Sequence, residues 1–115
     1  MKYIVLTLVL LGLSGCSQSL EKMAQDGDWY EIGYQDGVRG RTERSFKELD
    51  KLGNADVSSY SKGYGEGMTE YCNPNAAYQI GLSGQQYEGI CEGTPDAQRF
   101  RMEWERGWTE YEQGY

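Results

Sequence analysis

The chain has 115 residues with 18 acidic and 11 basic side chains, which gives a net charge of −7 at neutral pH, and it contains no histidine. The excess of acid argues against nucleic acids and anionic lipid head groups as partners, because both reward basic surfaces. The lack of histidine excludes the Ser-His, Cys-His and HExxH catalytic arrangements and leaves no complete zinc shell, so we expect no metal and no cofactor.

The first fifteen residues have the pattern of an export signal. Lys2 gives a positive start, and residues 3–13 form an almost unbroken apolar run. This run is shorter than the roughly 20 residues that a permanent membrane-spanning helix needs. We therefore predict that residues 1–15 are a signal peptide that is removed.

The end of this segment resembles the lipobox of bacterial lipoproteins, because residues 13–16 read Leu-Ser-Gly-Cys. The resemblance implies that Cys16 becomes the first residue of the mature chain and carries acyl chains such as palmitate. Two or more chains give stable anchoring to a lipid membrane. Ser17 stands where an aspartate would resemble an inner-membrane retention signal, so we expect the periplasmic face of the outer membrane. The alternatives are an ordinary secretory signal with an incidental cysteine and an internal core helix.

Residues 16–27 are polar and short, and we expect a lipidated N-terminus and tether there. A four-copy element begins soon afterwards: an aromatic residue, two other residues, a glycine, then an aromatic or leucine. The copies start at Tyr30, Tyr60, Tyr78 and Trp104. Their irregular spacing indicates a recurrent packing device and not a solenoid.

Helical periodicity accounts for most of residues 28–115, which we expect to form one small domain. We predict a helix from Asp28 to about Leu52, a second from an Asp56 cap to a stop at Pro74, and a last helix with a Thr94 cap and Pro95 at its first position. Glycine inside a helix costs about 1 kcal/mol relative to alanine, so we expect aromatics of one helix to seat on glycines of the next. The alternative for the first helix is a break near Gly40.

The segment between Cys72 and Cys91 is rich in Gly and Tyr, and we expect turns there, with a short hairpin as an alternative. Two cysteines left over in an oxidising compartment predict a disulfide, worth about 3 kcal/mol for a loop of about 20 residues. The predicted fold is therefore mainly α, a small helical domain of about three helices with an irregular disulfide-closed segment.

The motifs together resemble a family of short gammaproteobacterial lipoproteins classed only as a domain of unknown function. The similarity rests on Asp28-Trp29, on residues 32–37 (Ile-Gly-Tyr-Gln-Asp-Gly), on residues 71–74 (Tyr-Cys-Asn-Pro) and on residues 87–91 (Tyr-Glu-Gly-Ile-Cys). Many members carry a further cysteine in the region of residues 49–53, which this chain lacks. The resemblance implies no established activity and brings no catalytic residues.

Two sets of side chains are candidates for a site. Aromatics outside the regular helical stripes suit a sugar or a partner protein, with core packing as the alternative. These are Trp29, Tyr78 and Tyr87. Acids set among aromatics could form the carboxylate pair of a glycan hydrolase, with helix caps or solvated faces as the alternative. These are Asp28, Asp36, Glu66 and Glu70.

From these features we expect a non-catalytic interaction or envelope-maintenance module, anchored by its acyl chains, with an envelope protein or glycan as its partner. One alternative is an acidic inhibitor or cap of a cationic envelope-active protein. The other alternative is a cell-wall glycan hydrolase that uses a carboxylate pair.

Overall fold

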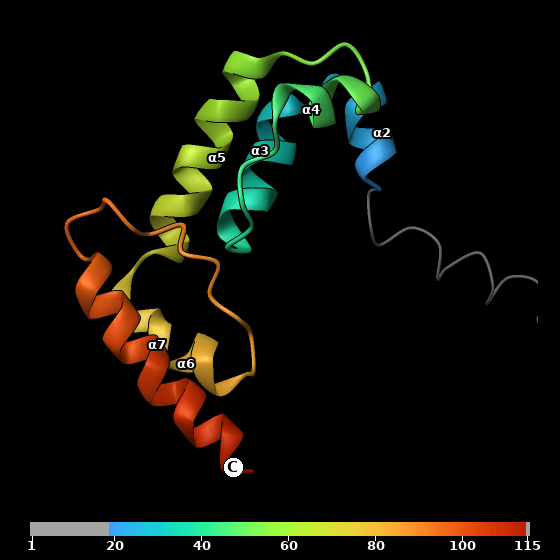
Figure 1. Cartoon of the computed structure of the whole chain (residues 1–115). Coiled ribbons are helices and arrows are strands. Elements are labelled where there is room, and N and C mark those ends of the chain that lie inside the picture. Colours follow the sequence, from blue (N-terminus) through green and yellow to red (C-terminus); the bar gives the residue numbers. More distant parts are fainter. Residues whose placement is uncertain (1–18, 115) are drawn as a thin grey trace, which may run out of the picture.

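The computed structural model describes residues 19–114, which form helices and irregular segments without a strand (Figure 1). The helices are α2 (Leu20–Gln25), α3 (Trp29–Val38), α4 (Phe46–Leu52), α5 (Val57–Tyr71), α6 (Pro74–Leu82) and α7 (Ala97–Glu112). The mainly α class is confirmed, whereas the prediction of about three helices is wrong because this part of the chain holds six. The predicted signal peptide and Cys16 lie outside the described residues.

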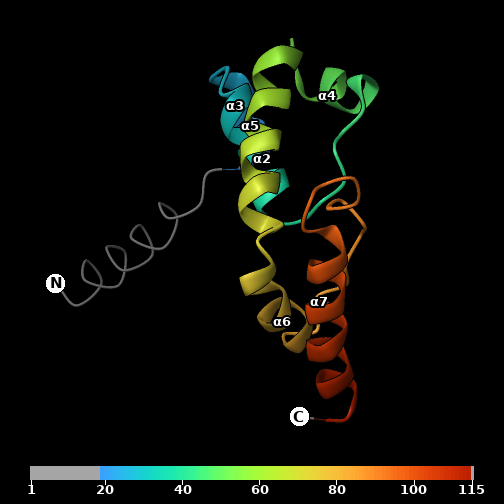
Figure 2. The ribbon, with the colours of Figure 1, turned by 90° about the vertical axis from the view of Figure 1, so that its left-hand side faces the viewer.

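The helices form two packed pairs, one above the other (Figures 1 and 2). Helix α3 packs along α5, and α6 packs along α7. Helix α2 contacts α3 at the end of the first pair, and its Ala24 is buried. Part of the segment that we expected as a tether is therefore folded onto the domain.

The single helix predicted from Asp28 to Leu52 is wrong, and the break near Gly40 is confirmed. Helix α3 ends at Val38, and Gly40 follows with a φ of +74°, a left-handed conformation that terminates a helix. A new helix starts after Ser45, whose side chain and Glu48 form a reciprocal capping box.

The structure confirms the second predicted helix and shifts the start of the last one. The Asp56 carboxylate accepts the Ser59 amide hydrogen at 3.1 Å and caps α5. Helix α7 begins at Ala97, because Asp96 takes the cap position while the Thr94 hydroxyl donates to the Cys91 carbonyl.

The turns predicted between Cys72 and Cys91 are wrong for the first half of that segment, which is helix α6. We interpreted Pro74 as a stop, but proline also suits the first position of a helix. Here it begins α6 after the Asn73 cap, whose side chain accepts the Asn75 amide hydrogen at 3.0 Å. Between α6 and α7, residues 83–96 are irregular.

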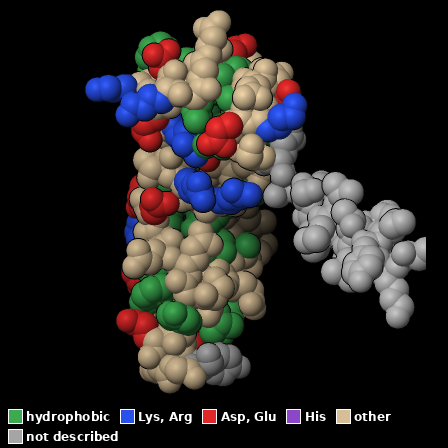
Figure 3. Space-filling model, turned by 90° about the vertical axis from the view of Figure 1, so that its right-hand side faces the viewer, with side chains coloured by type: hydrophobic (Ala, Val, Ile, Leu, Met, Phe, Trp, Pro, Cys, Tyr) green, Lys and Arg blue, Asp and Glu red, His purple; other side chains and the backbone are tan. Residues whose placement is uncertain are grey.

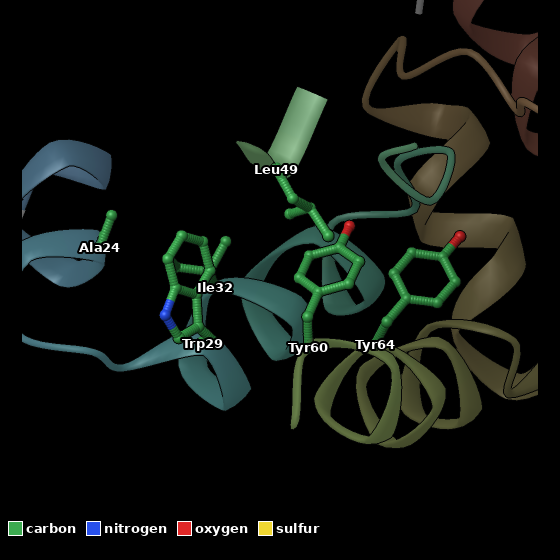
Figure 4. Close-up of a cluster of buried hydrophobic side chains, with 6 residues drawn as sticks. All are labelled: Ala24, Trp29, Ile32, Leu49, Tyr60 and Tyr64. Carbon is green, nitrogen blue, oxygen red and sulfur yellow. The ribbon is translucent and has the colours of Figure 1, made fainter. Parts of the chain in front are cut away.

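Each helix pair has its own core. In the first, Trp29 and Ile32 of α3 converge on Leu49 of α4 and Tyr60 of α5 (Figure 4). The second contains Tyr71, Cys72, Ala77, Cys91 and Phe100. Met68 packs against both cores and so links the pairs.

The surface differs between the two halves on the face seen in Figure 3. Lysine and arginine lie across its upper half and middle, and hydrophobic side chains gather below, over the second pair. Met102 and Tyr111 of α7 are among the exposed large hydrophobic residues. Within residues 19–114, no helix has the length and apolar character needed to cross a bilayer.

Candidate functional site

The first helix pair crosses at glycines that face backbone atoms of the other helix. A Cβ atom added at Gly33 would collide with the Tyr60 carbonyl oxygen and lie 2.8 Å from the Tyr64 amide nitrogen. One added at Gly63 would collide with the Tyr30 carbonyl oxygen and lie 2.9 Å from its carbonyl carbon. Real Cβ atoms essentially never approach closer than 3.0 Å, so both positions require glycine. We expected aromatic rings to seat on these glycines, but the backbone of the other helix lies there instead.

The same contact repeats one turn further along and again in the second pair. Gly37 and Gly67 face each other's helices, with added Cβ atoms 2.6 Å and 2.7 Å from backbone nitrogens. In the second pair, Gly81 faces the backbone of α7 and Gly107 faces that of α6. Added Cβ atoms would lie 2.7 Å and 2.8 Å from backbone nitrogens there. The four sequence copies therefore pair first with second and third with fourth, and each pair makes one crossing.

Gly81 and Gly107 of the second crossing correspond to Gly37 and Gly67 of the first. Gly40 and Gly84 each follow the crossing glycine by three residues, have positive φ, and leave room for a tyrosine ring. These rings belong to Tyr71 and Tyr111, four residues after Gly67 and Gly107. The two pairs are thus structural copies of one motif.

Tyrosine hydroxyls connect the two helices beside each crossing. Tyr30 donates to Glu66, and Tyr34 donates to Glu70 at 2.5 Å. In the second pair, Tyr78 donates to Glu110. The hydrogen bond to Glu66 is the main reason that the pKa of Tyr30 is raised to about 12. Tyr34 also has a raised pKa, chiefly because of its hydrogen bond to Glu70.

A buried charged network lies at the other side of the first crossing. Asp36 is only 4% exposed and accepts two hydrogen bonds from Arg44, at 2.7 and 3.3 Å, and one from the Tyr60 hydroxyl at 2.9 Å. The Tyr60 hydroxyl also accepts the Arg44 amide hydrogen at 2.9 Å. The network fastens the segment after Gly40 onto the first pair, because Arg44 lies in that segment.

The structure separates the four acids considered for a carboxylate pair. Asp36 holds Arg44 in the core, and Asp28 takes the cap position of α3 without a side-chain hydrogen bond. Glu66 and Glu70 accept tyrosine hydroxyls on the surface of the first crossing. Of the four, the structure brings only Glu66 and Glu70 together, one turn apart on α5.

The three candidate aromatics have different surroundings. Trp29 is 3% exposed and belongs to the first core, so it offers no surface to a partner. Tyr87 is partly buried, its ring packs on Phe100 and Trp104, and its hydroxyl accepts the Cys91 amide hydrogen and donates to Glu92. Tyr78 is partly exposed beside the second crossing.

The predicted disulfide is present. Cys72 and Cys91 are bonded, and the bond ties the junction of α5 and α6 to the irregular segment before α7.

A shallow cavity of about 610 Å³ lies between the irregular segment before α7 and the end of α3. Its lining includes Arg39, Arg41 and Glu88. Among residues 19–114, no three acids and cysteines are grouped closely enough to hold a metal ion.

Comparison with known proteins identifies the motif's family. A family model described as "Protein of unknown function (DUF2799)" matches residues 28–109. The chain belongs to this family. The Escherichia coli (strain K12) protein "Uncharacterized protein YfiL" is 30% identical over 112 residues, which cover 93% of this chain and 90% of that protein. No solved structure matches.

The DUF2799 match starts at the first residue of the Asp-Trp motif and includes the glycines of both crossings. The similarity to a domain of unknown function is therefore confirmed, while the lipoprotein character and the gammaproteobacterial restriction stay predictions. Sequence reasoning found the repeated element and its glycines but missed the pairing of the copies. A tyrosine stands three residues before Gly33, Gly37 and Gly81, and a glutamate stands three residues after the glycine that each of them contacts. This pattern would have been a signal for the pairing.

Tyr60→Phe should lower the free energy of unfolding, whereas Tyr71→Phe should not. Removing the Tyr60 hydroxyl deprives Asp36 and the Arg44 amide of a partner, and we expect a loss of about 2 kcal/mol. The buried Tyr71 hydroxyl has no hydrogen-bond partner within the described chain, so its removal should leave stability unchanged or raise it by up to about 1 kcal/mol. Urea unfolding at pH 7 measures both.

The Tyr71 variant should also change the response to alkali. Burial raises the pKa of Tyr71 to about 12, so the folded state resists ionisation of this phenol. The stabilisation is complete below pH 10 and is lost as the pH rises through 12. Tyr71→Phe should therefore lose less stability than the wild type between pH 10 and 12. An equal loss in both proteins would contradict the raised pKa of Tyr71.

Proposed function

We propose that this DUF2799 chain is a lipid-anchored protein of the cell envelope, held on the periplasmic face of the outer membrane, whose helical domain binds a partner without catalysing a reaction. The observation that carries the proposal is the buried Cys72–Cys91 disulfide. Structural disulfides persist in oxidising compartments and are rare in the cytosol. The export signal and the Leu-Ser-Gly-Cys sequence supply the route and the anchor.

The positions of the acids support binding over catalysis. A catalytic carboxylate must reach a substrate, but Asp36 is buried and occupied by Arg44. Glu66 and Glu70 are accessible, and each accepts a tyrosine hydroxyl of the same domain. These contacts favour a surface that recognises a partner.

Cys16→Ser tests the anchoring. Without a thiol to acylate, the variant should accumulate as an uncleaved precursor and leave the outer-membrane fraction, as followed by immunoblotting and by mass spectrometry of the N-terminus. The conservative control is Ser17→Ala, which should be processed and fractionated normally. Processing and outer-membrane fractionation of Cys16→Ser like those of the wild type would overturn the proposed anchor.

Crosslinking of intact cells that produce the tagged wild type tests the binding role. We expect a discrete adduct larger than the monomer. Absence of an adduct, together with release of soluble fragments when the purified protein is incubated with cell-wall glycan, would replace the binding role with the hydrolase.

A further inference from the structure

One surface of the first crossing combines aromatic rings with uncompensated negative charge. We call it the Tyr–Glu face: Tyr30, Glu31 and Tyr34 of α3, and Glu66 and Glu70 of α5. None of the ion pairs among residues 19–114 involves these three glutamates. Glu66 and Glu70 are exposed and accept only phenolic hydrogens, so their charges stay available to a cation.

The second crossing shows what the equivalent surface does with a cation. There the Arg106 guanidinium lies 4.0 Å from the centre of the Tyr78 ring, and it donates to Glu103 at 2.8 Å. Tyr78 in turn donates to Glu110. In this pair the chain's own arginine therefore covers the tyrosine ring and binds one carboxylate, while a second carboxylate accepts the tyrosine hydroxyl.

The two crossings can be compared residue by residue, because their glycines make the same contacts. Tyr34 corresponds to Tyr78, since each precedes a crossing glycine of its own helix by three residues. The carbonyl oxygen of each tyrosine also faces a glycine of the other helix. Glu70 corresponds to Glu110, since each receives that tyrosine's hydrogen bond. The residue immediately before the partner glycine is Arg106 in α7.

In α5 the residue at that place is Glu66. Where the second pair supplies a guanidinium, the first pair thus supplies another carboxylate. Lys62 holds the analogous place one turn earlier, before Gly63, yet within the described residues no cation lies over the ring of Tyr30 or Tyr34. The first crossing therefore has the ring and the acid that binds its hydroxyl, has Gly63 at the place of Glu103, and carries Glu66 at the place of the cation.

We infer that the Tyr–Glu face binds an arginine side chain of a partner protein, with the guanidinium over the Tyr34 ring and between Glu66 and Glu70. Arginine fits better than lysine, because its planar guanidinium stacks on an aromatic ring while its N–H groups bind carboxylates. The inference rests on the proposed function, since it names the chemistry that the partner must present. Figure 1 shows α3 and α5 side by side, so side chains of both helices can share one surface.

The test measures binding of a tetra-arginine peptide to the full chain in a neutral detergent at 150 mM salt by calorimetry. Glu66→Arg places a guanidinium where α7 has Arg106, and we expect at least a tenfold loss of affinity. The melting temperature should fall by no more than a few degrees, because the hydrogen bond lost with Tyr30 is an exposed one. Asp50→Arg makes the same change of charge at an exposed position of α4 and should change affinity less than threefold. Tetralysine should bind the wild type at least fivefold more weakly than tetra-arginine.

Equal losses in Glu66→Arg and Asp50→Arg would show that only the overall charge matters, and equal affinities for the two peptides would show that no guanidinium is recognised. Either result overturns the inference. If Glu66→Arg folds poorly, Glu66→Gln keeps the shape and should still weaken tetra-arginine at least threefold. Membrane fractionation and crosslinking do not use the peptide, so intact anchoring and adduct formation without peptide selectivity would remove this inference and keep the proposed function.

Discussion

Gly63→Ala is expected to destroy most of the stability of the first helix pair. The new methyl group would lie closer than 3.0 Å to backbone atoms of Tyr30, which cannot rotate away as a side chain can. Helices α3 and α5 would have to separate and lose contact along their whole length. We expect a loss of about 3 kcal/mol or more, a large part of the 5 to 15 kcal/mol typical of a folded domain.

Gly65→Ala is the matched control in the same helix. Gly65 lies inside α5, and an added Cβ atom there meets nothing within 4 Å. Alanine is the better helix former, so this variant should gain about 0.5 to 1 kcal/mol. Thermal unfolding followed by circular dichroism compares the two, and a Gly63→Ala protein that melts with or above Gly65→Ala would refute the backbone contact.

Loss of the disulfide is expected to lower stability by about 3 kcal/mol, because the bond closes a loop with a sequence separation of 19. In a domain of this size such a loss corresponds to a fall in melting temperature of about 10 °C or more. The double variant Cys72→Ala with Cys91→Ala avoids an unpaired thiol and a new buried hydroxyl. Its melting temperature measures the effect.

Reductant provides the internal control for this prediction. It should lower the melting temperature of the wild type to that of the double variant and leave the double variant unchanged. A digest of protein purified from cells without reductant should contain the peptide that links Cys72 to Cys91. Two free thiols in that digest would show that the bond does not form in the cell.

The sequence predicted the helical class well because its signals are local. The Asp56 cap and the spacing of aromatics in α5 and α7 depend only on neighbouring residues, and the structure confirms both helices. The break at Gly40 was less predictable, because the same glycine fits a kinked helix or a terminated one. The capping box of Ser45 and Glu48, which the prediction overlooked, favours termination.

Long-range contacts explain most of what sequence reasoning missed. We considered Asp36 for a carboxylate pair, with a helix cap or solvated face as the alternative, but Arg44 compensates its charge from beyond the end of α3. Likewise Trp29 lies off the regular stripes, yet Leu49 of α4 belongs to the same buried cluster. Neither contact follows from the spacing of residues within one helix.

The glycine crossings also limit which second mutations can compensate for a substitution. Where a side chain obstructs another side chain, a smaller residue at the second position restores the fit. At Gly63 the obstructing atoms are the carbonyl and neighbouring backbone of Tyr30, and those atoms are the same whatever residue stands there. A second mutation that makes a neighbouring side chain smaller therefore cannot suppress a substitution at these glycines. Reversion to glycine is the direct way to restore the fold.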